Sequence, residues 1–542
     1  MAQKMEKLPN KTPRPIEGHK PAAALLRDVV DKVYANAWEA KRRGELVGWS
    51  SSKFPIELAK AFDLNVVYPE NHAASTAAKK DGLRLCQAAE DMGYDNDICG
   101  YARISLAYAA GEPTDSRRMP QPDFLLCCNN ICNMMTKWYE NIARMHNIPL
   151  IMVDIPFSNT VDVPEEKVDY LLGQFDYAIK QLEELTGKKF DQKKFEDACA
   201  RANRTAAAWL KSCSFMSYKP SPLSGFDLFN HMADIVAARC EEDAAVGFEL
   251  LAQEFEQSVK ENTSTWEYPE EHRILFEGIP CWPALRPLFD PLKDSGVNVT
   301  AVVYAPAFGF RYSNIREMAA AYCKAPCSVC IETGVEWRET MAKENGISGA
   351  LVNYNRSCKP WSGAMPEIER RWKEDLGIPV VHFDGDQADE RNFSTEQYKT
   401  RVQGLVEIMD ERKQDKQAKG EDVYTNFKNT KETDWSKPTL EWGRTVWKQS
   451  KIYWNNLNIW QTIRGSSWIN ILRQGKKPSV FFRTMHRKKS SMQPASRRSA
   501  YGEGRDLSNG QKNTSPPSII RWRCVVWKWL WTAPSTGCPL RC

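Results

Sequence analysis

Apolar and polar positions alternate with two different spacings over residues 21–163. Apolar residues recur every three or four positions over residues 21–45 and 134–146, which is the spacing of an amphipathic helix. Short apolar runs bounded by polar turns predict β-strands, and these runs cover residues 46–49, 65–68, 123–128 and 149–155. Strands that alternate with helices at this spacing indicate a parallel sheet, so we predict a first α/β domain over residues 21–163, after a polar arm over residues 1–20.

The pattern changes after residue 163. Three long amphipathic stretches, over residues 165–186, 191–215 and 226–261, predict a helical domain that spans residues 164–265. Strand signals then return and predict a second α/β domain over residues 266–418; they cover residues 273–276, 298–304, 350–354 and 379–383. The predicted fold class is therefore α/β, with two Rossmann-like parallel-sheet domains and a helical domain between them in the sequence.

Four polar turns follow predicted strands directly: Ser50–Ser52, Glu70–Asn71, Asn129–Cys132 and Arg356–Lys359. Ligands of open parallel sheets bind just beyond the carboxyl ends of the strands. These turns are therefore the candidate functional loops.

The composition is that of an ordinary globular protein, with 42% hydrophobic and 26% charged residues among 542. No apolar run approaches the ~20 residues of a membrane helix, and the first residues lack the apolar segment of a secretory signal. We therefore expect a cytoplasmic protein whose sixteen cysteines stay reduced, which favours metal binding or simple burial over disulfides.

Residues 419–542 differ in character from the rest. Residues 431–542 hold 21 Lys and Arg against 5 Asp and Glu, and ten of the nineteen tryptophans lie between Trp435 and Trp531. A basic aromatic tail could bind nucleic acid or a membrane surface. The tail shows no sustained helical or strand period, however, so we favour a sequence not selected to fold, such as one read in a shifted frame. We predict that it is disordered and expect neither nucleic acid nor a membrane as a partner.

One cysteine triad has the spacing of a radical SAM cluster site. Cys323, Cys327 and Cys330 are separated by three and two residues. They lie late in the chain, however, beginning at a predicted helix end rather than in a loop after a first strand. The favoured interpretation is small residues that pack against one face.

Cys99, Cys132 and Cys358 lie in more promising surroundings. Cys132 follows a strand and precedes a helix, where the helix N-terminus favours a thiolate. Cys358 is flanked by cations, which also lower a thiol pKa, and Cys99 lies shortly before Arg103. Spacing alone does not separate the three from the other cysteines. Without further evidence, simple burial is the commoner role of a free cysteine.

Several segments together resemble the 2-hydroxyacyl-CoA dehydratase family, and within it the alpha subunits that act on 2-hydroxyglutaryl-CoA. Among them are VGWSSSKFP at 47–55, YPENHAA at 68–74, DICGYAR at 97–103, NNICN at 129–133 and VNYNRSCKPWSG at 352–363. The resemblance extends over about residues 22–415.

This resemblance implies a subunit that pairs with a similar beta subunit and holds a [4Fe-4S] cluster through three cysteines. Matched by motif, the ligands are Cys99, Cys132 and Cys358, although Cys127 and Cys128 adjoin the second motif and leave the choice of Cys132 open. The family's catalytic serine and glutamate fall on Ser52 and Glu70, the latter with a helix-capping role as the alternative.

The implied reaction is the dehydration of (R)-2-hydroxyglutaryl-CoA to glutaconyl-CoA through a ketyl radical, a hydro-lyase step of anaerobic glutamate fermentation. Acid–base catalysis supplies about 10²–10⁴-fold, which is too little for a carbon-3 proton that the carbonyl does not acidify. The implied electron donor is an ATP-dependent iron–sulfur activator protein. The family's heterodimers also carry reduced FMN or riboflavin, whose site we cannot assign. Arg103, Arg356 and Lys359 are the candidate cations for the distal carboxylate of the CoA-thioester substrate.

Other functions remain open. A different acyl group, such as lactoyl, phenyllactyl or isocaproyl, or a role as an aryl-CoA reductase subunit would use the same motifs. A non-catalytic iron–sulfur electron carrier is a further alternative, but it would need neither Ser52 nor Glu70.

Overall fold

The structure is a computed structural model that describes residues 5–8, 13–116 and 118–421. The tail expected to be disordered lies outside the described residues from residue 422 onward. The boundaries of the five predicted segments stay a prediction.

The first sheet contains four parallel strands in the order β2-β1-β3-β4. They are β1 (Val47–Ser50), β2 (Asn65–Val67), β3 (Phe124–Cys128) and β4 (Leu150–Val153). Every residue of β1 and β3 is buried, as expected where helices cover both faces of a parallel sheet. The strand order reverses between β1 and β3, and the carboxyl ends of strands at such a point form a crevice.

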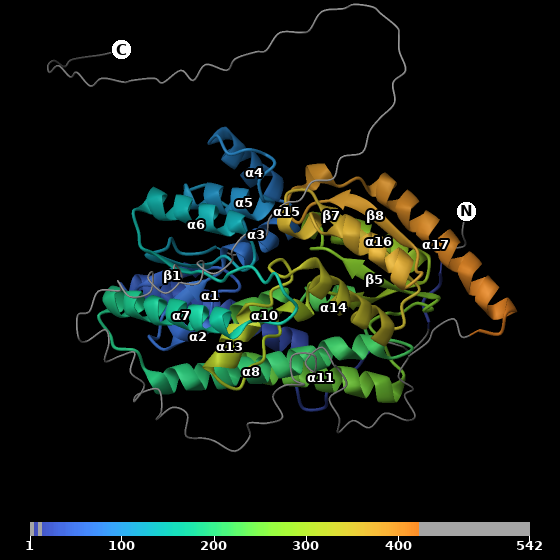
Figure 1. Cartoon of the computed structure of the whole chain (residues 1–542), viewed down its shortest axis with the longest axis horizontal. Coiled ribbons are helices and arrows are strands. Elements are labelled where there is room, and N and C mark those ends of the chain that lie inside the picture. Colours follow the sequence, from blue (N-terminus) through green and yellow to red (C-terminus); the bar gives the residue numbers. More distant parts are fainter. Residues whose placement is uncertain (1–4, 9–12, 117, 422–542) are drawn as a thin grey trace, which may run out of the picture. The chain divides into compact units, whose positions relative to one another are not determined.

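Six helices accompany this sheet (Figure 1). They are α1 (Ala22–Arg42), α2 (Ile56–Lys60), α3 (Pro69–Ala78), α4 (Gly82–Asp91), α5 (Gly100–Ala109) and α6 (Asn133–His146). The pattern analysis did not predict α3, α4 or α5. All ten residues of α5 are buried, so the helix has no polar face to produce a periodic signal. Glu70–Asn71, expected as a polar turn, lies in the first turn of α3.

The segment after β4 is helical, as predicted, but with more breaks. It contains α7 (Glu165–Thr186), α8 (Gln192–Ser214), α9 (Gly225–Phe229), α10 (Met232–Ala237) and α11 (Glu242–Glu261). The single helical stretch expected over residues 226–261 is therefore wrong. The break after α10 allows the buried Arg239 to donate a hydrogen bond of 2.9 Å to the carbonyl of Phe54, beside the first sheet.

The second sheet repeats the connectivity of the first, with parallel strands in the order β6-β5-β7-β8. Its strands are β5 (His272–Glu277), β6 (Val297–Val302), β7 (Gly349–Asn355) and β8 (Val380–Gly385). The accompanying helices are α12 (Leu285–Asp294), α13 (Ile315–Tyr322), α14 (Ile331–Glu344), α15 (Lys359–Ser362), α16 (Met365–Asp375) and α17 (Thr395–Ala418). The predicted α/β class with two parallel sheets is confirmed.

Hydrophobic side chains pack on both faces of the second sheet. One large core joins the first sheet, the helical segment and one face of the second sheet, while a smaller core packs α14 and α16 on the other face. None of the helices in the described part of the chain is long and apolar enough to cross a membrane.

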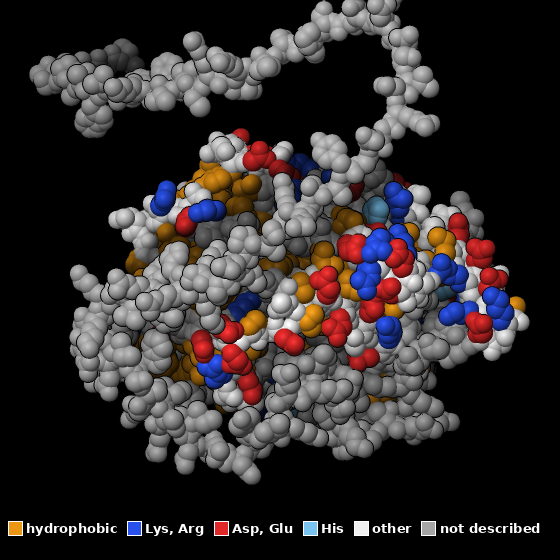
Figure 2. All heavy atoms as spheres, viewed as in Figure 1, with side chains coloured by type: hydrophobic (Ala, Val, Ile, Leu, Met, Phe, Trp, Pro, Cys, Tyr) orange, Lys and Arg blue, Asp and Glu red, His pale blue; other side chains and the backbone are white. Residues whose placement is uncertain are grey.

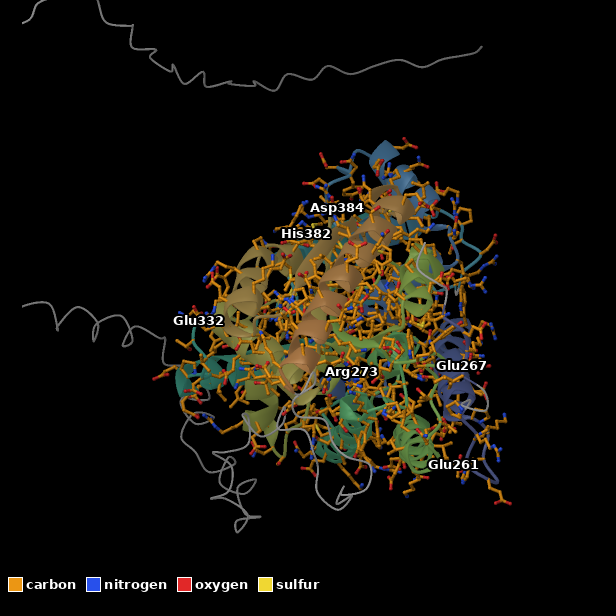
Figure 3. All side chains as sticks on the ribbon, turned by 90° about the vertical axis from the view of Figure 1, so that its right-hand side faces the viewer. Glu261, Glu267, Arg273, Glu332, His382 and Asp384 are labelled. Carbon is orange, nitrogen blue, oxygen red and sulfur yellow. The ribbon has the colours of Figure 1, made fainter. Side chains whose placement is uncertain are left out.

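Charged side chains of opposite sign are interspersed on the outside of the second sheet. Arg370 pairs with Glu367 along α16, and blue and red side chains intermingle in this region of Figure 2. His382 and Asp384, labelled in Figure 3, are two positions apart and both exposed on β8. Because β8 is at the sheet edge, charges there disfavour pairing with a strand of another chain.

Candidate active site

A cavity of about 430 Å³ lies among residues that follow the strands of both sheets. Its lining includes Ser52 after β1, Glu70 after β2, Cys132 after β3, Tyr304 after β6, Cys358 after β7 and Gln387 after β8. The carboxyl ends of both sheets thus contribute to one cavity. This is where ligands of such sheets are expected, and the cavity joins segments that are far apart in the sequence.

Ser52 and Glu70 form a hydrogen-bonded pair in this cavity. The Ser52 hydroxyl donates a bond of 2.6 Å to Glu70 Oε1, and the Ser52 backbone N–H lies 3.0 and 3.2 Å from the two carboxyl oxygens. Burial raises the pKa of Glu70 to about 7, although the bonds from Ser52 oppose this shift. A carboxyl group with this pKa can both accept and donate a proton at neutral pH.

Cys99, Cys132 and Cys358 occupy equivalent local positions, each immediately before the first residue of a helix. In each case the backbone N–H three residues later lowers the thiol pKa; these residues are Ala102, Met135 and Trp361. Burial has the larger effect and raises the pKa of all three thiols. A positive charge supplied from outside, such as a metal, would reverse that balance.

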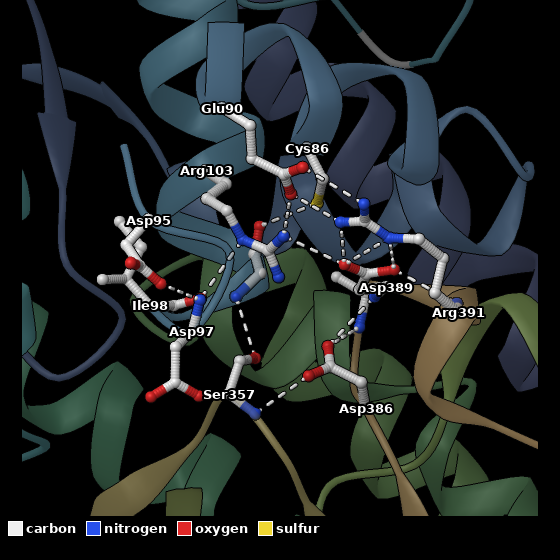
Figure 4. Close-up of polar contacts among 12 residues, drawn as sticks. Cys86, Glu90, Asp95, Asp97, Ile98, Arg103, Ser357, Asp386, Asp389 and Arg391 are labelled. Carbon is white, nitrogen blue, oxygen red and sulfur yellow. Dashed lines mark hydrogen bonds and ion pairs between the residues drawn. The ribbon is translucent and has the colours of Figure 1, made fainter. Parts of the chain in front are cut away.

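Ser357 connects two of these cysteine turns. Its hydroxyl accepts bonds of 3.0 Å from the Gly100 backbone N–H and from Gln387 Nε2, and Gln387 Nε2 also lies 3.5 Å from the Cys99 sulfur. Asp386 accepts the Ser357 backbone N–H at 3.0 Å (Figure 4). A Cβ atom at position 100 would lie 3.0 Å from an Asp386 oxygen, so glycine allows this close approach. The start of α5 is thereby fixed against the turn after β7.

Cys99, Cys132 and Cys358 are the candidate ligands for a metal cofactor. Across residues 5–8, 13–116 and 118–421, no three His, Cys, Asp or Glu side chains converge on a point where they could hold one metal ion. Cys99, Cys132 and Cys358 nevertheless line the same cavity, and after burial itself the neighbouring thiols of Cys327, Cys99 and Cys132 raise the pKa of Cys358. Thiols that are neighbours without touching suit a cluster that binds each ligand through a different iron atom.

Cys127 and Cys128 are buried on β3 and do not line the cavity. The Cys128 sulfur lies 3.0 Å from Asn130 Oδ1. Of the radical SAM-like triad, only Cys327 lines the cavity, because Cys323 ends α13 in the core and Cys330 precedes α14.

The three candidate cations for the substrate carboxylate lie elsewhere. Arg103 is fully buried and pairs with Glu90 at 2.6 Å and Asp389 at 2.9 Å (Figure 4). The other two are exposed, and they pair as Arg356 with Asp384 and Lys359 with Asp97. None of the three lines the cavity. The structure therefore gives Arg103 a structural contact between α5 and the turn after β8.

The sequence analysis missed Lys53, a cation that does line the cavity and is only 4% exposed. Its ammonium group donates a bond of 2.7 Å to the Ala307 carbonyl and lies 4.7 and 4.8 Å from the ring centres of Phe308 and Phe310. Burial lowers the pKa of Lys53 to about 7. Its position directly after Ser52 could have identified Lys53 as a site residue, but only Ser52 was considered in that turn.

A family model described as 2-hydroxyglutaryl-CoA dehydratase, D-component, matches residues 51–409. The chain belongs to this family. The match includes every residue of the cavity discussed above. The family description and the names of the most similar relatives identify the chain as a dehydratase subunit, which makes it part of a hydro-lyase.

Individual relatives agree with this membership. The chain is 55% identical to (R)-2-hydroxyglutaryl-CoA dehydratase, subunit alpha, of Acidaminococcus fermentans, with 72% of this chain and 97% of that protein aligned. It is 51% identical to the (R)-phenyllactyl-CoA dehydratase alpha subunit of Clostridium sporogenes and 46% identical to the (R)-2-hydroxyisocaproyl-CoA dehydratase alpha subunit of Clostridioides difficile. These two alignments cover 72% and 73% of this chain and 96% and 97% of the relatives. The resemblance to dehydratase alpha subunits is confirmed, while the acyl group differs among these relatives.

Proposed function

We propose that this chain is the catalytic alpha subunit of a dehydratase that converts (R)-2-hydroxyglutaryl-CoA to glutaconyl-CoA. The observation that carries the proposal is the shared cavity, where the Ser52–Glu70 pair and three helix-preceding cysteines come together. The name and 55% identity of the Acidaminococcus relative support this acyl group.

Cys99, Cys132 and Cys358 would hold a [4Fe-4S] cluster in this cavity, with one iron free of protein ligands. When bound, the cluster would supply single-electron chemistry, which lets the thioester carbonyl carry the negative charge that expels the 2-hydroxyl group. The residues fit this group because buried thiols with raised pKa values need an external positive charge to become thiolates.

The protein's own side chains would supply the hydrogen bonds and accept the proton in this reaction. The Ser52 hydroxyl can donate a hydrogen bond to the departing hydroxyl or to the thioester oxygen, because it needs only to rotate away from Glu70. Glu70 can then take up the carbon-3 proton, since its pKa of about 7 allows the carboxylate and the acid to interconvert at neutral pH. The aromatic walls formed by Phe308 and Trp361 limit the entry of water.

The relatives' names as subunits support a partner for this chain. We infer that it forms a heterodimer with a homologous beta subunit in the cytoplasm and receives its electron from an ATP-dependent iron–sulfur activator protein. Reduced FMN or riboflavin would belong to the assembled heterodimer, and no site for it is assigned to this chain.

A second candidate function is the dehydration of a bulkier, uncharged 2-hydroxyacyl-CoA. The relatives that are 51% and 46% identical carry phenyllactyl and isocaproyl names. The cavity wall includes Phe229, Trp282 and Leu285, which would suit such an acyl chain.

The test is to purify the chain anaerobically with the beta subunit and to measure iron, visible absorbance and turnover with activator and ATP. Wild-type protein should be brown and should dehydrate 2-hydroxyglutaryl-CoA faster than phenyllactyl-CoA. Cys99→Ala, Cys132→Ala and Cys358→Ala should each lower the iron content. Cys330→Ala is the matched control, because Cys330 also precedes a helix but lies outside the cavity. Colourless wild-type protein, or equal iron loss in the control, would contradict the proposal.

A further inference from the structure

The Lys53 amine lies in surroundings that offer no opposite charge to its protonated form. Within the described residues, its ammonium group contacts a backbone carbonyl and two aromatic rings, and no carboxylate lies within ion-pair distance of it. The nearby buried cation Arg239, by contrast, reaches Glu57 at 3.4 Å. A buried charge without an opposite charge is costly, so the surroundings of Lys53 lack an anion.

The acidic groups of the cavity are already engaged. Glu70 accepts three contacts from Ser52, and Asp234 bonds to His231 at 2.9 Å. The other cation in the cavity wall, Arg27, is exposed. Lys53 is therefore the buried cation that a ligand inside this cavity would meet, at the end of the same turn that carries Ser52.

We propose that Lys53 binds the distal carboxylate of a dicarboxylic acyl group and so selects it over an uncharged acyl chain. This inference rests on the proposed function and names the residue that would separate a 2-hydroxyglutaryl substrate from the phenyllactyl and isocaproyl substrates of the relatives. It replaces Arg103, Arg356 and Lys359 as the candidate cation, because those three pair with carboxylates outside the cavity. The alternative is that Lys53 offsets the charge of the cluster. Among the described residues, however, the ammonium group donates its hydrogen bond to the Ala307 carbonyl and not to any of the three proposed ligands.

The experiment compares two unreactive ligands of equal chain length, glutaryl-CoA and pentanoyl-CoA, which differ only in the distal carboxylate. Their dissociation constants are measured by calorimetry on the anaerobic holoenzyme without activator, so that no turnover is needed. Wild-type protein should bind glutaryl-CoA about 10- to 100-fold more tightly, which corresponds to one hydrogen bond to a charged group. Lys53→Met should reduce this preference to about twofold or less, and Lys53→Arg should retain most of it.

Arg27→Met is the matched control, since it removes a cation from the exposed part of the same cavity wall. It should leave the ratio of the two dissociation constants unchanged. Iron content and visible spectrum should be the same in Lys53→Met as in wild type, and a changed spectrum with an unchanged ratio would establish the charge-offset role and overturn the proposal. Lys53→Gln provides a second neutral variant if the methionine variant does not fold.

Wild-type protein alone can also overturn the proposal, by binding both ligands equally. That result would leave the proposed function standing if the same preparation dehydrates 2-hydroxyglutaryl-CoA. A tenfold preference that Lys53→Met retains would equally exclude Lys53 as the carboxylate partner.

Discussion

The contact between Ser52 and Glu70 places a hydroxyl and a carboxyl group with shifted pKa on one wall of the cavity. Three hydrogen bonds from one residue hold the carboxyl group in a single orientation. Burial nevertheless raises its pKa to about 7. The alternative considered from sequence was a capping role at the start of α3. The carboxyl group does interact with its own backbone N–H there, and the bonds from Ser52 are made in addition to that contact.

Glu70→Gln should therefore lower the turnover number by about 10²–10⁴-fold, the usual contribution of a positioned acid or base. Glutamine keeps an acceptor for the Ser52 backbone N–H, so the fold and the iron content should be retained. The measurement is turnover of 2-hydroxyglutaryl-CoA together with iron content and circular dichroism. Glu140→Gln, at an exposed ion pair on α6, is the control and should behave as wild type. Full activity of the Glu70 variant would show that another group moves the proton.

A separate prediction concerns His72 and the free energy of unfolding at low pH. It lies in α3 with its ring 4.4 Å from that of Tyr108, and both ring nitrogens lack a hydrogen-bond partner in the described part of the chain. Burial lowers its pKa from 6.5 to about 4. The unfolded chain therefore binds a proton more readily than the folded one, and the stability due to neutral His72 is lost as the pH falls from about 6.5 to about 4.

The full loss should be on the order of 3 kcal/mol, of which about 2 kcal/mol falls between pH 7.5 and pH 5. Urea denaturation of the iron-free chain at pH 7.5 and pH 5 measures it. His72→Phe, which keeps the ring and cannot be protonated, should reduce the difference between the two pH values. An unchanged difference in this variant would assign the acid sensitivity to other groups.

At the scale of the elements, buried ion pairs determine how the helix that follows Cys99 sits against the second sheet. Arg103 on α5 contacts Asp389, in the turn after β8, and Glu90 on α4. Arg391 also bonds both of these carboxylates (Figure 4). Removing Arg103 leaves Arg391 alone to offset two carboxylates, of which Asp389 is buried.

Arg103→Met should therefore destabilise the chain by about 3–5 kcal/mol. Calorimetric unfolding measures the change, and Arg370→Met at an exposed pair on α16 should change little. The preference for glutaryl-CoA over pentanoyl-CoA should survive in any folded Arg103→Met protein. A lost preference with unchanged stability would restore Arg103 as a substrate residue.

The elements that the sequence predicted correctly share a strong local signal. The eight strands and the long helices α1, α7 and α8 show clear apolar runs or amphipathic spacing. The helix α5 gave no such signal because all its residues are buried, and the stretch over residues 226–261 hid its breaks because apolar residues continue through them. Ser52 and Glu70 were predicted as site residues by motif resemblance, and the structure shows that they are hydrogen-bonded to each other. Lys53 was missed because its burial depends on Phe308 and Phe310, more than 250 positions away in the chain.

At the scale of the whole molecule, the two sheets have the same strand order, and the carboxyl ends of both supply the cavity. Each sheet alone could be predicted from its own pattern, but which turns of the two sheets meet depends on long-range contacts. The bond between Gly100 and Ser357 joins residues 257 positions apart. No local periodicity carries that information, so a full account of the site required the structure.

The last prediction concerns α17 and asks which C-terminal residues the chain requires in order to fold. Tyr398 on this helix donates a bond of 2.7 Å to the Leu288 carbonyl, and Leu405 and Met409 are buried against the second sheet. The family match ends at residue 409, and the described residues end at 421.

If the proposed function holds, a chain that ends after residue 421 should keep its iron content, its pairing with a beta subunit and at least half of its activity. A chain that ends after residue 394 should lose all three, because it lacks the buried side chains of α17, and exposing several large apolar side chains costs about 2–5 kcal/mol each. Both truncations remove the basic stretch over residues 431–542, so they separate a need for α17 from a need for that stretch. If the chain that ends after residue 421 remained folded but inactive, the basic stretch would take part in catalysis or in contact with a partner.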